Sequence, residues 1–364
     1  MGRAGVASLP LHGGKAPRWL FDRMVKLASA IFDVMLMEHD AAYVLQLLAD
    51  PFWFQALSCV LGFDWHSSGT TTVTCGALKE ALADHDAIRV AGGKGSRSHD
   101  TLDELGVIGD VFALDGQYVD MLRYTSRMAA KVDNAAVQDG YHLYHHCMLV
   151  TRQGDWAVIQ QGMHPGRQYA RRYHWLCDEV QDMVEEPHSA VLGERRQTMN
   201  MTARDSHDAR DASVDLLNDG PRHLRRDWKL LTLPGQQTTL DGRRGMQPKT
   251  LHMPRQFNWS LLKKAYELQP SSYEDMLAIR GIGPSTVRAL AYIAALMYGS
   301  PPAWRDPARY SFAVGGKDGI PYPVNRRAMD EATALIREGV EEASVGTKDK
   351  LRAVERLKHL VEPF

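Results

Sequence analysis

The C-terminal fold is decided by residues 276–290, which read Met-Leu-Ala-Ile-Arg-Gly-Ile-Gly-Pro-Ser-Thr-Val-Arg-Ala-Leu. Two apolar helical segments meet in this stretch across a Gly-Ile-Gly turn. Gly281 and Gly283 allow a tight turn with positive φ and no side chain in the way. The second helix is expected to begin at Pro284, a favoured residue in a first helical turn. Its unpaired N–H groups would present partial positive charge to an anion, so the stretch predicts a phosphate-holding helix pair.

This stretch resembles the helix-hairpin-helix motif, which binds the DNA backbone through the amides of its turn without reading the base sequence. Val287 departs from the motif, which often has alanine there. The residues that we expect to contact DNA phosphates are Gly281, Gly283, Ser285 and Thr286. Phosphate contacts supply affinity and position, but they do not define a chemistry. A helix pair joined by a glycine turn and used only for packing is the alternative interpretation.

Composition points to an ordinary globular protein. The chain has 364 residues, of which 44% are hydrophobic and 24% charged, and this length predicts two or three domains. It has neither an apolar signal core nor a run of membrane-spanning length, so we expect a cytoplasmic protein without membrane contact. The four cysteines stand far apart and have no Cys-x-x-Cys spacing: they are Cys59, Cys75, Cys147 and Cys177. Their spacing therefore indicates neither a zinc ribbon nor a disulfide framework.

The net charge of -1 gives no general attraction to nucleic acid, so DNA binding would need local patches. One such patch lies between residues 222 and 255, where eight basic side chains face two acidic ones. This excess suits either a surface that follows DNA or a solvated basic linker.

Several N-terminal stretches show apolar residues at three- and four-residue spacing, which indicates amphipathic helices. One begins at Met24, and others are expected at about 41–48, 51–61, 72–83 and 117–137, with a short strand at 87–91. Ser271 with Glu274 predicts a capping box that starts the first helix of the glycine-turn pair.

The period then changes. Residues 141–151 and 155–163 are rich in aromatic and β-branched residues and are separated by Arg152-Gln153-Gly154, which predicts a β-hairpin.

The predicted fold class is α+β, with different character in the two halves of the chain. An N-terminal mixed helical domain with a small antiparallel sheet is expected over residues 1–184. Residues 185–255 are polar with little periodicity and are interpreted as a connector. An all-α domain that contains the helix-hairpin-helix is expected over 256–364, with final helices near 326–343 and 348–360.

The predicted hairpin and its entry hold the main candidates for catalysis. Asp133 and Asp139 precede the first strand and His146 lies on it. Gln161 lies near the end of the second strand. Alternation places His145 and His146 on opposite faces, so the histidines of this strand cannot all share one metal ion.

Carboxylates beside a histidine suit a hydrated divalent ion. We expect Asp133, Asp139 and His146 to bind Mg²⁺ or Mn²⁺, which would polarise a phosphodiester and help to generate a nucleophilic water. Gln161 would orient water or substrate. Two strands with a preceding acid and a glutamine resemble metal-dependent nucleases of the restriction-enzyme type, although Met163 stands where those enzymes have lysine. Alternatively, these residues form hydrogen bonds that close a small sheet.

A second polar cluster contains Asp64 and His66, which are candidates for a metal site or for acid–base catalysis. The Ser/Thr-rich residues 67–72 that follow equally suit a helix cap.

Basic side chains supply further candidates for phosphate contacts. Arg171 and Arg172 are interleaved with aromatic rings, a combination that suits phosphates and unstacked bases, although surface decoration explains it equally well. Lys94 and Lys317 each lie in a glycine-rich loop whose amides could hold a phosphate. Neither loop has the spacing of a nucleotide-hydrolysing P-loop, and both also fit simple turns.

Motifs spread over most of the chain resemble the domain-of-unknown-function 763 family of bacteria and archaea. The family has no established activity to transfer. The motifs are Leu9-Pro10-Leu11-His12-Gly13-Gly14, Asp64-Trp65-His66-Ser67-Ser68-Gly69, Gly92-Gly93-Lys94-Gly95, Gln138-Asp139-Gly140-Tyr141, Gln160-Gln161-Gly162-Met163, Arg171-Arg172-Tyr173-His174-Trp175 and Gly315-Gly316-Lys317-Asp318-Gly319.

Together these features predict a cytoplasmic DNA-processing enzyme, a metal-dependent nuclease that acts in DNA repair. DNA is the expected partner, through its backbone and without sequence specificity. Two alternatives remain open. A helix-hairpin-helix DNA glycosylase would use Asp306 as its catalytic acid, although Ser285 replaces the lysine of bifunctional members. A non-enzymatic DNA-binding or scaffold protein would use the polar clusters only to support the fold.

Overall fold

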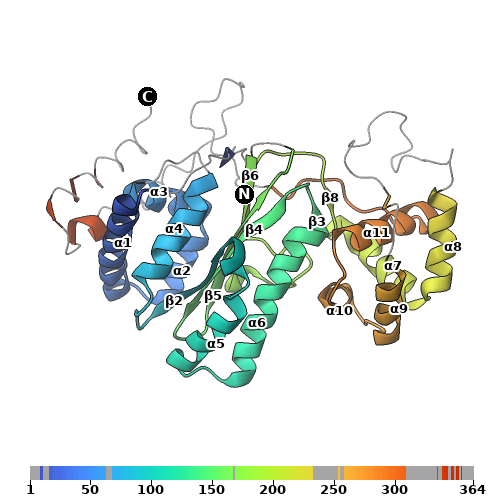
Figure 1. Cartoon of the computed structure of the whole chain (residues 1–364), viewed down its shortest axis with the longest axis horizontal. Coiled ribbons are helices and arrows are strands. Elements are labelled where there is room, and N and C mark those ends of the chain that lie inside the picture. The colour runs from blue at the N-terminus through green and yellow to red at the C-terminus, as the bar shows by residue number, and fades with distance from the viewer. Residues whose placement is uncertain are drawn as a thin grey trace.

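The computed structural model describes residues 9–10, 16–62, 68–166, 169–232, 253–254 and 258–308, with short pieces between 334 and 354. Helices at one end, a central sheet and a helical bundle at the other end follow one another along the long axis (Figure 1). The predicted mixed α+β fold is confirmed. Most of the final helices expected near 326–343 and 348–360 lie outside the described residues.

The centre of the protein is a six-stranded antiparallel sheet. Its order is β1-β6-β5-β4-β2, with β7 paired to β6. The strands are β1 (Leu9–Pro10), β2 (Ile88–Lys94), β4 (His142–Thr151), β5 (Trp156–Met163), β6 (Tyr169–Leu176) and β7 (Ala190–Leu192). The predicted hairpin is therefore confirmed as β4 and β5. Strand pairing sets His146 opposite Gln160 and Gln161 opposite Arg172.

Strand β6 differs from the sequence-based interpretation. Its arginines and rings were expected at a surface, but Arg171 and Arg172 are both fully buried within the sheet. Alternation along the strand sends them to opposite faces. A strand that is covered on both faces normally has a nearly continuous apolar sequence. Because Arg171 and Arg172 interrupt that pattern, the sequence did not predict a strand here.

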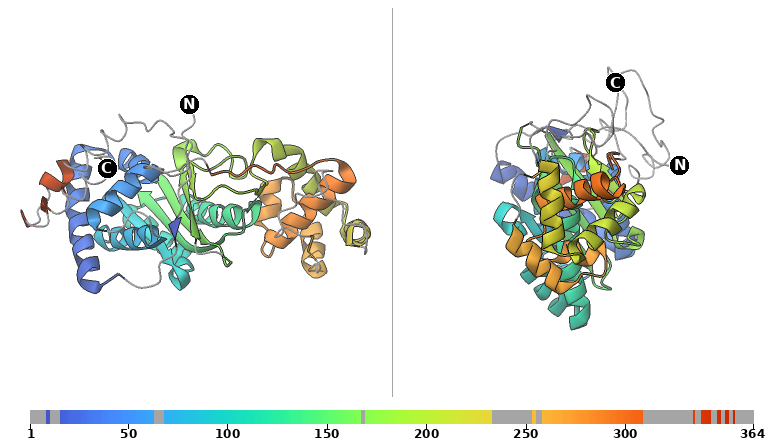
Figure 2. Two further views of the ribbon diagram at one scale, coloured as in Figure 1. Left: turned by 90° about the horizontal axis from the view of Figure 1, so that it is seen from above. Right: turned by 90° about the vertical axis from the view of Figure 1, so that its right-hand side faces the viewer.

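Four N-terminal helices form a layer over one face of the sheet, and the first of them packs on the other helices at the outer side of this layer (Figure 2). They are α1 (Arg18–Glu38), α2 (Ala41–Ala49), α3 (Pro51–Leu61) and α4 (Ser68–Ala81). Asp40 and Asp50 accept hydrogen bonds from the first-turn amides of α2 and α3, which fixes where these helices begin. The apolar sides of the helices pack on sheet residues such as Val90, Leu149 and Ile159.

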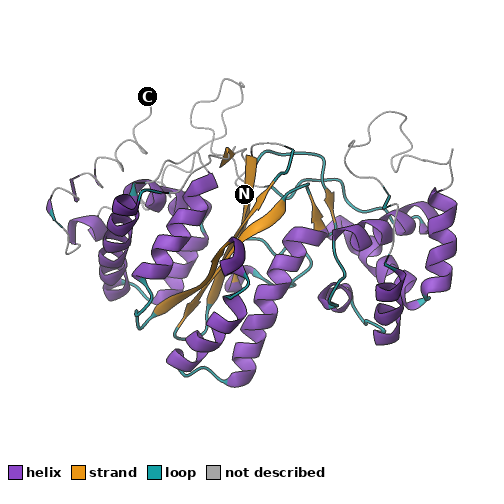
Figure 3. Cartoon of the chain, in the orientation of Figure 1, coloured by secondary structure: helices purple, strands orange, loops and turns teal. Residues whose placement is uncertain are grey.

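The other face is covered by α5 (Thr101–Phe112) and α6 (Gly116–Lys131), which follow a 3-10 turn, η1 (Gly95–Ser98) (Figure 3). The helix predicted over 117–137 does not continue as an α-helix to its end. It passes into a π-helical turn, η2 (Val132–Ala136), which carries the buried Asp133. Such turns are frequent at functional sites.

The C-terminal helices share one hydrophobic core with this second face. They are α7 (His207–Asn218), α8 (Pro221–Thr232), α9 (Trp259–Leu268), α10 (Tyr273–Ala278) and α11 (Pro284–Tyr298). Short elements join them to the sheet: β3 (Val137–Gln138) pairs with β8 (Met199–Asn200), and the 3-10 turns are η3 (Cys177–Glu179) and η4 (Arg204–Ser206).

The predicted connector at 185–255 is therefore corrected over its first part. It contains β7, β8, α7 and α8, whereas 233–252 and 255 lie outside the described residues. Its helices were missed because their apolar faces are narrow: the buried apolar side chains of α7 include Val214, Leu216 and Leu217 among charged neighbours.

Within the described part of the chain, no single helix has the length and apolarity to cross a membrane. Helices α2 and α3 meet that criterion only together, and they bend by 92° at their junction.

Candidate functional site

A pocket of about 700 Å³ lies between the segments on either side of β7 and the segment after α11. Its wall carries three arginines, Arg195, Arg196 and Arg305. The ionisable residues that share the wall with them are Glu186, His188 and Asp306. Glu186 lies 3.6 Å from Arg305 as an ion pair, and Glu194 pairs with Arg196. Among the described residues Arg195 is the arginine of this wall without a carboxylate partner. The pocket therefore combines guanidinium donors for an anion with a histidine for proton transfer.

His188 is held by the buried carboxylate of Asp133. Its Nε2 donates to Oδ1 of Asp133, and the side chains are 5% and 0% exposed. The second oxygen of Asp133, Oδ2, accepts from Gln160 Nε2 at 2.6 Å and from Trp175 Nε1 at 3.1 Å. Since Nε2 faces the carboxylate, Nδ1 is the nitrogen available to a group in the pocket. This arrangement fixes the ring and its tautomer, as a general base requires.

The network continues behind Asp133 to His146. Gln160 Oε1 lies 2.8 Å from His146 Nδ1, and Ser126 Oγ lies 2.8 Å from His146 Nε2. Because the Gln160 amide nitrogen donates to Asp133, its oxygen must accept from Nδ1–H, and Nε2 must accept from the Ser126 hydroxyl. Burial lowers the pKa of His146, so its ring is neutral at pH 7. His146 therefore orients Gln160, one side chain away from Asp133.

Asp139 belongs to a separate ion-pair cluster. Arg171 donates through Nη1 to Asp139 Oδ2 at 2.9 Å and through Nη2 to Asp306 Oδ2 at 2.7 Å. The Tyr173 hydroxyl and the Tyr141 amide also donate to Asp139. Burial raises the pKa of Asp139, and Arg171 and Tyr173 act in the opposite direction. Two carboxylates on one buried guanidinium form a rigid structural centre beside the pocket.

Asp306 is committed to the same centre. Besides Arg171, its Oδ2 accepts from the Arg196 amide at 2.7 Å and from Thr198 Oγ1 at 3.2 Å. Its Oδ1 accepts from the Ala308 amide at 2.8 Å. Four donors on one carboxylate occupy its oxygens and orient the chain after α11.

The predicted metal ligands are not brought together. The ligand atoms of Asp133, Asp139 and His146 do not gather within 4.8 Å of one another. Asp133 and Asp139 instead each satisfy their oxygens with several protein donors. The sequence placed them correctly at the entry of the hairpin, but it did not show that each faces a different set of donors.

Gln161 lies on the opposite face of the sheet from Asp133. Its Nε2 donates to the Ser68 carbonyl at 2.8 Å and to the Tyr144 hydroxyl, and its Oε1 accepts from Thr71. Strict alternation along β4 would put Tyr144 on the same face as His146, away from Gln161. A register shift between Leu143 and His145 accompanies the contact between Tyr144 and Gln161. Gln161 therefore joins β5 to α4 instead of facing the pocket.

Arg172 also faces the α4 side. It is fully buried, stands 4.8 Å from the Phe54 ring, and makes long hydrogen bonds of 3.5 Å to Thr71 and Gln55. Burial lowers its pKa to about 10. Of the two arginines predicted to bind phosphate, only Arg171 is near the pocket, and it is engaged by carboxylates.

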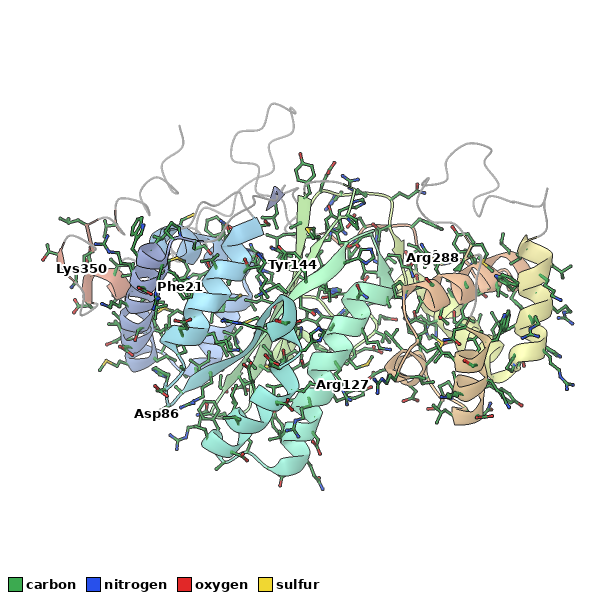
Figure 4. All side chains as sticks on the ribbon, viewed as in Figure 1. Phe21, Asp86, Arg127, Tyr144, Arg288 and Lys350 are labelled. Carbon is green, nitrogen blue, oxygen red and sulfur yellow. The ribbon has the colours of Figure 1, made fainter. Side chains whose placement is uncertain are left out.

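Lys94 is exposed at the end of β2, with its Nζ 5.8 Å from the ring centre of Tyr144. Figure 4 shows Tyr144 at the sheet, away from the C-terminal helices. Asp64, His66 and Lys317 lie outside the described residues.

The predicted glycine turn connects α10 to α11, and α11 begins at Pro284 as expected. Gly281 has a φ of 100°, whereas Gly283 has an extended φ of −139°. The expectation of positive φ therefore holds at Gly281 only. The capping residue of α10 is Ser272, which accepts from the Asp275 amide, so the predicted box is displaced by one residue.

Lys131, at the end of α6, stabilises this turn through hydrogen bonds to its carbonyl groups. Its Nζ donates at 2.8 Å to each of three carbonyl oxygens, those of Leu277, Ile279 and Ile282. Burial lowers the pKa of Lys131 to about 8. The ammonium group of Lys131 offsets the partial negative charge of these three carbonyl oxygens. Ser285, in the first turn of α11, is exposed to solvent.

A second contact ties the turn to the pocket. Gln138 Nε2 donates to the Pro284 carbonyl at 2.7 Å, and the β3 strand that carries Gln138 pairs with β8. Asn200 of β8 lines the pocket and bridges to Ala303. The turn and the pocket are therefore parts of one hydrogen-bonded frame.

Sequence reasoning missed His188, Gln160 and Trp175 as partners of Asp133. Gln160 lies beside the candidate Gln161, and the sequence does not distinguish which of the two faces Asp133. His188 offered no signal, because it follows Glu185-Glu186-Pro187 in a polar stretch and lies 55 residues from Asp133.

A family profile described as "Protein of unknown function (DUF763)" matches residues 5–324. No curated protein and no solved structure matches the chain.

Proposed function

Since the chain belongs to the DUF763 family, whose function is unknown, we propose from its side-chain chemistry that it is a DNA-processing phosphodiesterase. The glycine turn at 279–286 binds the DNA backbone, and the arginine-lined pocket that adjoins it cleaves a phosphodiester. The observation that carries the proposal is the Asp133–His188 pair on the wall of a pocket with three arginines.

Backbone binding follows from the geometry of the turn. The amides of Ser285 and Thr286 in the first turn of α11 have no helical acceptors, so a phosphate oxygen can accept from them. Arg280 and Ser285 are exposed beside these amides. Two further arginines lie on neighbouring elements: Arg127 is on α6, whose Lys131 contacts the turn, and Arg288 is on α11, which follows it (Figure 4). Contacts of this kind read charge and spacing and give no base specificity.

Cleavage follows from the chemistry of the pocket. Neutral His188 accepts a proton from water at Nδ1, and Asp133 stabilises the resulting imidazolium through Nε2–H. Arg195, Arg196 and Arg305 bind the phosphate oxygens, whose charge increases in the transition state. A requirement for Mg²⁺ or Mn²⁺ stays a prediction, which reactions with and without EDTA test.

The glycine turn and the pocket act on the same DNA strand, because hydrogen-bonded segments of the protein connect them. Gln138 connects the turn to β3, β8 carries Asn200 to the pocket, and residues 299–308 lead from the end of α11 to the pocket wall. A backbone held at the turn therefore extends towards the pocket. The exposed basic residues of α8, Arg222, Arg225 and Lys229, extend the positive surface of the same bundle.

A charge-reversal pair tests the binding half. Ser285→Glu adds a carboxylate to the first turn of α11, where it stabilises the helix but repels phosphate. Ser260→Glu makes the same change in the first turn of α9, and Ser260 is also exposed. We expect Ser285→Glu to weaken binding of labelled duplex and single-stranded DNA by about tenfold or more and Ser260→Glu to leave it within twofold. Equal binding by both variants would remove the turn from the DNA interface.

A further inference from the structure

Three potential metal ligands meet on the sheet face opposite the pocket. Cys75 comes from α4, and His145 and Cys147 come from β4, where two-residue spacing gives them a common face. Their ligand atoms all lie within 4.8 Å of one another, and all three side chains are buried. Sequence spacing gave no hint of this group, because 72 residues separate the two cysteines.

His145 is the unusual member of the group. It is 1% exposed, and within the described residues neither of its ring nitrogens has a hydrogen-bond partner. A buried polar group without a partner costs about 1–3 kcal/mol, so a ring nitrogen of this kind requires an explanation. A metal ion bound to one nitrogen supplies the missing partner.

The ligand types decide which cation suits the site. Burial raises the pKa of the Cys75 thiol, and the buried charge of Arg172 acts in the opposite direction. A coordinated metal ion itself deprotonates a thiol, so the thiolates form when the ion binds. Oxygen ligands, which Mg²⁺ and Ca²⁺ require, are absent from the trio, and sulfur with imidazole selects softer cations.

We propose that Cys75, His145 and Cys147 bind one thiophilic cation, Zn²⁺ or Cu⁺. Both thiols lose their protons as the ion binds, and with Zn²⁺ the two thiolates balance its charge. The ion joins α4 to β4 and so fastens the N-terminal helical layer to the sheet. This role is structural and independent of the proposed cleavage, because the pocket lies on the other face.

Metal content of the full-length protein tests the site. Protein purified under reducing conditions, without chelator, is measured by elemental analysis for zinc and copper, which also tells the two ions apart. We expect about one equivalent per chain in the wild type and in Cys59→Ala, a buried cysteine of α3 outside the trio. We expect less than a tenth of an equivalent in Cys147→Ala and His145→Ala.

A measurement on the wild type avoids any folding defect of the variants. The protein is stripped with chelator and titrated with Co²⁺, and a thiolate-to-cobalt charge-transfer band should saturate at one equivalent. Zinc should then displace the cobalt and raise the melting temperature. Absence of the band, an equal band in Cys147→Ala, or a Cys75–Cys147 disulfide in the freshly purified protein would overturn the proposal.

Discussion

Replacing Lys131 with methionine removes the cation that holds the glycine turn while keeping most of the apolar stem. The ammonium donates to the carbonyl oxygens of Leu277, Ile279 and Ile282, each at 2.8 Å. Hydrogen bonds to a charged group contribute about 1.5–3 kcal/mol each, and water replaces part of that value where Lys131 is half buried. We take about 1 kcal/mol per bond, and therefore about 3 kcal/mol for positioning the turn.

If half of this energy orders the amides that we propose to bind phosphate, the affinity for DNA should fall about tenfold, since 1.4 kcal/mol corresponds to a factor of ten. Fluorescence anisotropy with labelled duplex at low salt measures the change. Lys264→Met, an exposed residue of α9, is the matched control for the loss of one positive charge. If Lys131→Met bound DNA within twofold of Lys264→Met at equal thermal stability, the assigned role of Lys131 would be refuted.

The same site predicts a pH effect. Burial lowers the pKa of Lys131 to about 8, so raising the pH from 7 to 9 removes its proton and its charge. Wild-type DNA affinity should fall over this interval more steeply than that of Lys131→Met, in which the group is missing. Parallel pH profiles for the two proteins would show that Lys131 does not control binding.

Three stability predictions follow from the buried polar groups. Trp175→Phe removes the indole donor to Asp133 and should lower the free energy of unfolding in urea by about 1–3 kcal/mol more than Trp53→Phe does. Trp53 is the control because its buried Nε1 has no partner among the described residues. Equal losses of stability in the two variants would contradict the hydrogen bonds assigned to Asp133. Arg171→Met leaves Asp139 and Asp306 without their shared cation and should cost about 3–5 kcal/mol, whereas exposed Arg152→Met should cost little in the same urea experiment. Burial lowers the pKa of His145 to about 3, below its unfolded value of about 6.5, so the unfolded chain binds the extra proton and stability should fall as the pH drops below 6.5. Urea midpoints between pH 7 and 5, measured with EDTA, should change less in His145→Gln than in exposed His207→Gln; identical slopes would remove His145 from the acid response.

The local features of the fold were readable from the sequence. The β4–β5 hairpin was predicted because its strands are β-branched and aromatic on both sides of a Gly154 turn, and α11 was predicted because Pro284 follows a glycine turn. In these places propensity, period and turn chemistry agree.

Strand β6 was not readable, because Arg171, Arg172 and His174 are polar residues in a buried strand. Their burial depends on partners elsewhere in the chain: Arg171 requires Asp139 and Asp306, which lie 32 and 135 residues away. Local pattern cannot contain that information. The sequence therefore singled out the right polar residues, but it predicted that they lie at the surface, whereas they are buried.

The candidate site was predicted only in part for the same reason. Asp133 was singled out as an acid at the hairpin entry and assigned to a metal site, but its partner His188 lies 55 residues further on, in a stretch without period. The Cys75–His145–Cys147 group likewise exists only in three dimensions. Side chains that converge from separate elements become visible once the sheet register is known.

Cleavage of labelled DNA by wild type and His188→Gln is the most direct test of the proposed function. Glutamine retains an N–H donor for Asp133 but cannot accept a proton as a base. Duplex, single-stranded and branched DNA are incubated with Mg²⁺, with Mn²⁺ and with EDTA, and His207→Gln serves as the exposed control. We predict cleavage by the wild type and the control, and a rate about 100-fold lower for His188→Gln at unchanged DNA binding. DNA left intact by the wild type in every condition, or equal cleavage by both variants, would contradict the account.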